Sequence, residues 1–197
     1  MNVRTIAWTA VICLSPLMAP VATAQSAVID EPYFAGLPEA CSYLTEALAA
    51  GMLRAPAQAS PANEHIPTFW SQCIYSGRGV VGRQVNFTFK FMLHELTDVR
   101  KLAPVQLDFN VTFAVGNIPP SDKLTDLGKV SFVFEKAGLT ILMMVTGIQG
   151  PADGAGRPTE FIATYQLSDP DMPHAERLAQ LLPHARRHLQ EWLQQAT

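Results

Sequence analysis

The chain has 197 residues, enough for one domain with a sizeable hydrophobic core and too few for two of ordinary size. Hydrophobic residues make up 48% of the chain and charged residues 16%, a balance that excludes a disordered chain. The net charge is -3 and no long basic run occurs, which argues against nucleic acid as the main partner.

Residues 1–24 are predicted to be a cleaved secretory signal peptide. Arg4 supplies the positive charge, residues 6–14 form a short apolar stretch, and Ala-Thr-Ala at 22–24 provides a cleavage site. No segment of the chain approaches the roughly 20 apolar residues that a membrane-spanning helix needs. We therefore expect a periplasmic or secreted mature chain without a membrane span; the alternative is an uncleaved N-terminal anchor.

Two cysteines, Cys41 and Cys73, remain after the signal peptide is removed, because Cys13 lies within it. In an oxidising compartment they have one possible pairing, which predicts a Cys41–Cys73 disulfide. The closed loop of about 30 residues would stabilise the fold by about 3–4 kcal/mol, since it lowers the entropy of the unfolded chain. The alternative is two buried free thiols.

Residues 25–36 are predicted to be a lead-in, and residues 37–197 a single domain. A helix should begin near Pro38, a residue favoured in the first turn of a helix. Apolar side chains then recur at three- and four-residue spacing and form one face of this helix: Cys41, Leu44, Leu48 and Met52.

Six strands are predicted between this helix and a second one. They cover residues 69–75, 85–93, 107–115, 130–134, 139–145 and 161–167. Most of them alternate apolar and polar residues, whereas 139–145 is apolar throughout most of its length, as is typical of a central strand covered on both faces. The second helix should start near Pro173 and be kinked or split at Pro183.

Short connections between strands favour antiparallel neighbours, so we expect an α+β fold. It would hold an antiparallel sheet of about six strands, with an N-terminal helix and a long C-terminal helix packed on it. This element order, the placement of Cys41 and Cys73, and the hairpin over residues 126–145 resemble small exported α+β sandwich domains of the PsbP-like type. The resemblance implies a binding or accessory module and carries over no catalytic residue.

Two motifs with possible chemistry are weakened by their context, and the motif of a serine nucleophile is absent. The G-x-G-x-x-G pattern at 77–82 precedes a strand, whereas dinucleotide binding requires a helix there, so a hairpin turn is expected. His184 and His188 are weak candidates for a metal pair, but arginines separate them and a solvated basic helix face is the alternative. No serine lies in a G-x-S-x-G elbow, and spacing links neither His65 nor His94 to a nucleophile.

Ligand or partner binding is predicted at Trp70, Asp153 and Arg157. The last two lie in a long connection over residues 147–158, and long loops often carry function. The alternatives are a variable loop without a role and a core position for Trp70.

The leading hypothesis is an exported, periplasmic binding or interaction module without catalysis of its own, with an envelope protein as a possible partner and no cofactor. A second hypothesis is a carrier of a small apolar ligand, in a pocket between sheet and helix. Its lining would come from Phe87, Phe89, Phe91, Phe109 and Phe113. A metal-dependent hydrolase that uses His184 and His188 is the third hypothesis.

Overall fold

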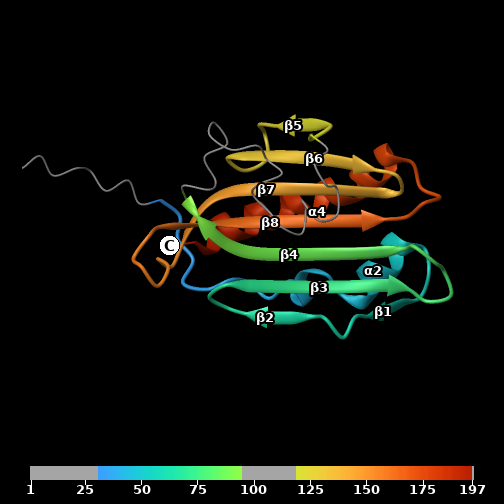
Figure 1. Cartoon of the computed structure of the whole chain (residues 1–197), viewed down its shortest axis with the longest axis horizontal. Helices are drawn as coiled ribbons and strands as arrows, with labels where there is room; N and C mark the ends of the chain where they lie inside the picture. The colour runs from blue at the N-terminus through green and yellow to red at the C-terminus, as the bar shows by residue number, and fades with distance from the viewer. Residues whose placement is uncertain (1–30, 95–118, 197) are drawn as a thin grey trace, which may run out of the picture.

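The computed structural model describes residues 31–94 and 119–196 (Figure 1). Its helices are α1 (Ala40–Tyr43), α2 (Glu46–Leu53) and α4 (His174–Gln195). Its strands are β1 (Ala57–Ala59), β2 (Glu64–Ile66), β3 (Trp70–Gly77), β4 (Gln84–Leu93), β5 (Asp122–Leu124), β6 (Val130–Lys136), β7 (Leu139–Gly150) and β8 (Thr159–Ser168). The predicted signal peptide and the predicted strand at 107–115 lie outside the described residues.

The strands form one antiparallel sheet in the order β1-β3-β4-β8-β7-β6-β5, with β2 also paired to β3. The described sheet has 8 strands, so the prediction of about six is corrected. Three of them, β1, β2 and β5, have three residues each, too few to produce an alternating pattern. The α+β class and the antiparallel pairing are confirmed.

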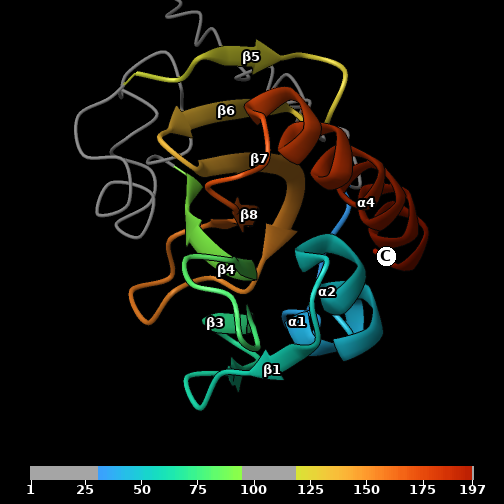
Figure 2. The same cartoon turned by 90° about the vertical axis from the view of Figure 1, so that its right-hand side faces the viewer.

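All three described helices lie on one face of the sheet, as Figures 1 and 2 both show. The expected N-terminal helix is divided into α1 and α2. The division falls at Thr45, whose extended backbone lets its side chain accept a hydrogen bond from the amide of Leu48. Thr45 thus serves as the N-cap of a new helix, a role that its side chain fills better than a helix-interior position.

The C-terminal helix α4 runs past Pro183 as a single element of 22 residues, so the expected split at this residue is not observed. Proline removes the hydrogen bond to the carbonyl four residues earlier, here that of Ala179. Pro183 and Ala179 are both exposed, so water can satisfy this carbonyl. The helix packs on β7 and β8.

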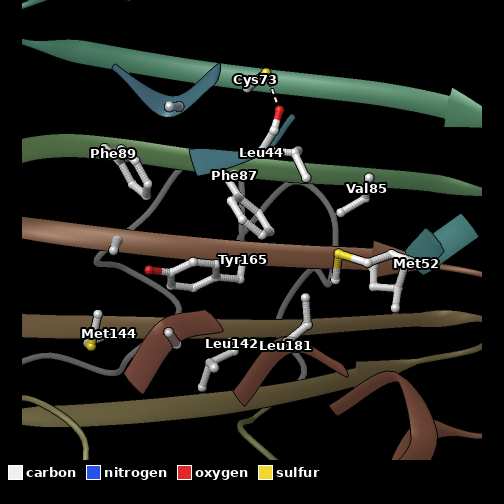
Figure 3. Close-up of a cluster of buried hydrophobic side chains, with 14 of the residues drawn as sticks. Leu44, Met52, Cys73, Val85, Phe87, Phe89, Leu142, Met144, Tyr165 and Leu181 are labelled. Atoms are coloured by element: carbon white, nitrogen blue, oxygen red, sulfur yellow. Dashed lines mark hydrogen bonds between the residues drawn. The ribbon is translucent and has the colours of Figure 1, made fainter. Parts of the chain in front are cut away.

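The main core lies between the sheet and the helices, and Figure 3 shows its centre. Phe87 and Tyr165, on neighbouring strands, are fully buried with ring centroids 4.8 Å apart. A second apolar cluster lies on the other face of the sheet. Alternate residues of β7 contribute to the two clusters: Leu142 and Met144 to the first, Ile141 and Met143 to the second. This confirms that residues 139–145 form a strand covered on both faces.

Cys41 and Cys73 form the predicted disulfide, with their Cα atoms 5.0 Å apart. It joins α1 to β3, and Cys73 is fully buried. Next to the disulfide, the hydroxyl of Ser71 accepts a hydrogen bond from the first amide of α1, that of Ala40, at 2.8 Å. Covalent and polar contacts therefore fix this short helix to the sheet.

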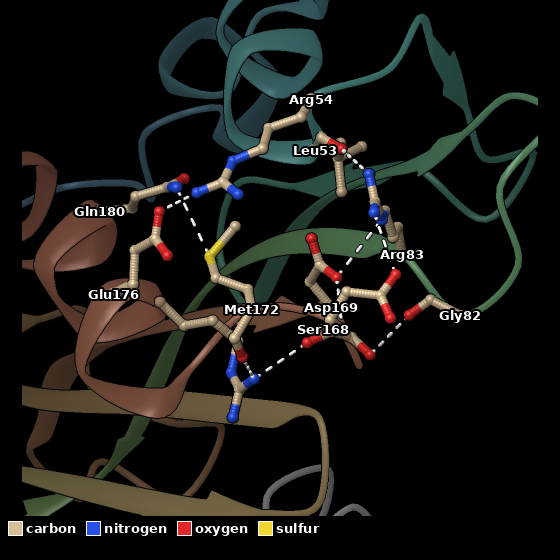
Figure 4. Close-up of polar contacts among 11 residues, drawn as sticks. Leu53, Arg54, Gly82, Arg83, Ser168, Asp169, Met172, Glu176 and Gln180 are labelled. Atoms are coloured by element: carbon tan, nitrogen blue, oxygen red, sulfur yellow. Dashed lines mark hydrogen bonds and ion pairs between the residues drawn. The ribbon is translucent and has the colours of Figure 1, made fainter.

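Polar contacts fix the start of α4, and Figure 4 shows several of them. The buried guanidinium of Arg177 donates to the hydroxyl of Thr140 at 2.9 Å. It also donates to the backbone carbonyls of Asp169 and Met172. The buried carboxylate of Asp169 pairs with Arg83, whose Nε lies 3.3 Å from Oδ1. These buried charges are satisfied within the fold, which identifies them as structural.

Candidate functional site

A hollow of about 480 Å³ lies at the end of the sheet where β3 begins and β4 ends. The connection between β7 and β8 forms its other wall. Its lining is mainly apolar and consists of Thr68, Phe69, Phe91, Leu93, Pro151, Ala152, Asp153, Gly154 and Thr159. Its volume falls within the range of small-ligand pockets.

Gly150 makes room for one wall of this hollow. A Cβ on this residue would lie 2.2 Å from the Cδ1 atom of Phe91 and 2.6 Å from the hydroxyl of Thr159. Only glycine therefore allows the Phe91 ring to cross the end of β7. A register irregularity between Val145 and Gln149 precedes it and bends the strand toward this end.

The connection between β7 and β8 is shorter than predicted, because β7 continues to Gly150 and leaves residues 151–158. Asp153 organises it. Its Oδ1 accepts hydrogen bonds from the amides of Ala155, at 3.0 Å, and Arg157, at 2.8 Å. Its Oδ2 lies 2.7 Å from Nη2 of Arg157. The structure thus brings the two predicted loop residues together, and the hydrogen bond from Arg157 lowers the pKa of Asp153.

Among the large apolar residues that line the hollow, Phe69 is the most exposed, with 63% of its surface accessible. The sequence pattern predicted its neighbour Trp70 instead. Trp70 is half-buried and does not line the hollow. Trp70 is the first residue of β3, whereas Phe69 lies in the turn before it, where its amide donates a hydrogen bond to the carbonyl of Ile66.

The polar side chains that line the hollow are largely engaged. The hydroxyl of Thr159 donates to the carbonyl of Pro151 at 2.8 Å. Both carboxylate oxygens of Asp153 accept hydrogen bonds from within its own loop. The hollow therefore presents apolar surface with few directional polar groups.

A smaller polar hollow of about 120 Å³ lies at the edge of the sheet. Its lining is Glu39, Cys41, Asn63, Glu64, His65 and Gln72. Here the Nδ1 atom of His65 lies 3.0 Å from the hydroxyl of Ser71, a pairing that spacing alone did not reveal. Ser71 is fully buried and bonded to α1, so the pair links structural elements; a nucleophile must be accessible to its substrate.

His184 and His188 differ sharply in environment, and the expected solvated face is wrong for His188. His188 is fully buried, and its Nδ1 lies 3.2 Å from the hydroxyl of Tyr165. Burial, together with Arg187 and His184, lowers its pKa to about 3. The two imidazole rings are 6.2 Å apart, and among residues 31–94 and 119–196 no three His, Cys, Asp or Glu side chains gather to hold a metal ion.

His94, the other histidine that spacing did not link to a nucleophile, lies beside Glu160. This carboxylate is fully buried at the start of β8, on the sheet face opposite the helices. The Nζ atom of Lys129 lies 3.3 Å from it and the Nδ1 atom of His94 lies 3.7 Å from it. The ammonium group of Lys129 thus offsets this buried negative charge, as a buried charge in a folded protein requires.

Together these features define an α+β protein with one antiparallel sheet, helices on one face, and an apolar hollow at one end of the sheet. No protein-family model, curated protein or solved structure matches the chain. Within the described residues, no helix combines the length and the apolar character needed to cross a bilayer.

Proposed function

We propose that this protein is an exported, non-catalytic binding module whose binding site is the hollow around Phe69. One observation supports this above the others. A largely exposed aromatic side chain forms the rim of a mainly apolar hollow of about 480 Å³. Exposed aromatic side chains beside apolar pockets are typical of surfaces that bind a ligand or partner.

Binding is favoured over catalysis because the polar residues with possible chemistry are committed to the fold. Ser71 is buried against α1, and His188 is enclosed by aromatic rings. The carboxylate and guanidinium of Asp153 and Arg157 bind each other. An active site instead needs such groups to converge on a substrate. The proposal also includes the resemblance to PsbP-like domains, which implies a binding or accessory role.

Export from the cytoplasm is part of the proposal. The disulfide between Cys41 and Cys73 is compatible with an oxidising, extracytoplasmic compartment. Mass spectrometry of the chain purified from a bacterial periplasm should show a mature form that begins at Gln25. A cytoplasmic product that keeps residues 1–24 would contradict this part.

A carrier of a small apolar ligand is the second candidate, because the volume of the hollow suits such a molecule. The site differs from the pocket expected between sheet and helix. Phe87 and Phe89 are fully buried there in ring contacts with Tyr165 and Trp192. Phe91 does line the hollow, whereas Phe109 and Phe113 lie outside the described residues.

Titration with N-phenyl-1-naphthylamine, an apolar dye that fluoresces when shielded from water, tests the hollow as a binding site. The wild-type protein should bind the dye saturably. Phe69→Ser should weaken binding about tenfold, because it removes most of one aromatic contact surface. Val81→Ser is the matched control, since Val81 is 96% exposed in the turn between β3 and β4.

Equal binding by wild type and Phe69→Ser would remove the hollow as the site. Native mass spectrometry of protein purified from its host then separates the two candidates. A co-purifying small apolar mass that Phe69→Ser loses supports the carrier. If no small apolar mass co-purifies but the wild-type protein still binds the dye, the result supports a site for a protein partner.

A further inference from the structure

The strand β2 forms an open edge of the sheet. Among the described residues it pairs with β3 alone, and its three side chains are all exposed. The strand β1 occupies the other half of the same side of β3. An open edge leaves backbone amides and carbonyls available to an added extended chain.

Successive residues of the β2–β3 hairpin line the two hollows. Glu64 and His65 line the polar hollow, and Thr68 and Phe69, in the turn that follows, line the apolar one. His65 contacts Ser71, which is bonded to α1, and the disulfide joins β3 to α1, so the polar hollow lies beside this helix. A chain laid along β2 therefore passes the polar hollow and then reaches the apolar one.

The two hollows differ in the chemistry that they offer. Glu39 and Glu64 are exposed carboxylates in the polar hollow, and neither forms an ion pair with another described residue. Negative charge of this kind favours a basic side chain. The apolar hollow presents Phe69, Phe91 and few free polar groups, so it favours an aliphatic or aromatic side chain.

We propose that the edge of β2 and its two hollows bind an extended segment of a protein partner by strand addition. This inference rests on the proposed function and names its partner class. The segment carries a lysine or arginine next to Glu39 and Glu64, and an apolar side chain in the hollow at Phe69.

The charges favour a peptide over a lipid surface as the occupant. Bacterial membrane surfaces carry anionic headgroups, which Glu39 and Glu64 would repel. A membrane surface also supplies no extended backbone to pair with the open edge of β2. A peptide uses the edge, the negative charge and the apolar hollow at once.

A positional set of fluorescein-labelled hexapeptides tests the proposal by fluorescence anisotropy. One position carries Lys, Ser or Glu, and another, one to four residues away, carries Phe, Leu or Ser. Peptides with both Lys and an apolar residue should bind most tightly and lose affinity at high salt. N-methylation of alternate backbone amides in the tightest peptide should abolish binding, because strand addition needs those hydrogen bonds.

Two variants separate the contributions. The double variant Glu39→Gln and Glu64→Gln should reduce the preference for Lys over Ser by about fivefold and keep the preference for an apolar residue. Phe69→Ser should do the reverse, and Val81→Ser should change neither. Circular dichroism of each variant checks that the fold is retained.

The outcomes also separate this inference from the proposed function. If Phe69→Ser weakens dye binding but the wild-type protein shows no preference for peptides with Lys, the inference is overturned and the proposed function stands. Failure of the wild-type protein to bind either the dye or the peptides overturns both. Binding to phosphatidylglycerol vesicles that Phe69→Ser abolishes, with no peptide bound, replaces the peptide by a membrane surface.

Discussion

His188 gives the sharpest test of the core, because a histidine enclosed by aromatic rings must lose stability when it is protonated. It lies on α4 with its ring 4.7 Å from that of Tyr43 and 5.7 Å from that of Trp192. Arg187 donates toward its Nε2 at 3.4 Å, so its Nδ1 carries the proton and donates to Tyr165. The folded protein thus holds the neutral imidazole.

The sign and size of the effect follow from the pKa of His188, about 3 in the folded protein against 6.5 when exposed. A lowered histidine pKa means that stability is full above about pH 6.5 and is lost as the pH falls toward 3. This one group should lower the free energy of unfolding by about 2 kcal/mol at about pH 5. Near pH 3 the loss should approach roughly 4–5 kcal/mol.

Urea unfolding, followed by tryptophan fluorescence at about pH 7.5 and about pH 5, measures this loss. Other groups titrate as well, so the informative quantity is the difference between wild type and His188→Phe. The variant should be less stable at neutral pH but should lose about 2 kcal/mol less on acidification. The exposed His65, replaced by Gln, serves as the control. Equal acid losses in wild type and His188→Phe, or an imidazole that titrates near pH 6.5 by NMR, would refute the buried neutral state.

Two further predictions concern the disulfide and the hollow. Replacing both Cys41 and Cys73 by Ala should lower the free energy of unfolding by about 3–4 kcal/mol, because the bond closes a separation of 32 residues. Urea unfolding measures this loss, and a variant as stable as wild type would contradict the prediction. Gly150→Ala should cost about 1–3 kcal/mol and weaken dye binding, because the new methyl group displaces the Phe91 ring. Gly154→Ala, in the connection that follows β7, is its control, since nothing lies within 4 Å of the added methyl, and equal thermal stability of the two variants would contradict the steric argument.

Much of the fold was predictable from local patterns. Alternation of apolar and polar residues identified β3, β4, β6 and β8 as strands. The alternation did not reveal that several polar side chains of β4, β6 and β8 are buried as well. The apolar run of β7 predicted burial on both faces, which the two apolar clusters confirm. Cysteine counting predicted the Cys41–Cys73 bond, because two thiols have one possible pairing.

The candidate site was predictable only in part. Asp153 and Arg157 were chosen because they lie in a long connection, and the structure places Asp153 in the wall of the hollow. Their binding to each other was not foreseen, since four-residue spacing within a loop does not determine the backbone geometry. Trp70 was predicted because a tryptophan on one face of the first strand can be an exposed binding aromatic, whereas the structure places its neighbour Phe69 in the lining of the hollow.

The sequence by itself determined most of the longer strands, the C-terminal helix, the α+β class and the disulfide, since each depends on residue type and spacing along the chain. The tertiary structure decided the burial of His188, the order of the strands and the meeting of Phe69, Phe91 and Asp153 at one end of the sheet. These features depend on contacts between residues far apart in the chain. Such contacts follow from how the sheet and the helices pack, which no local pattern records.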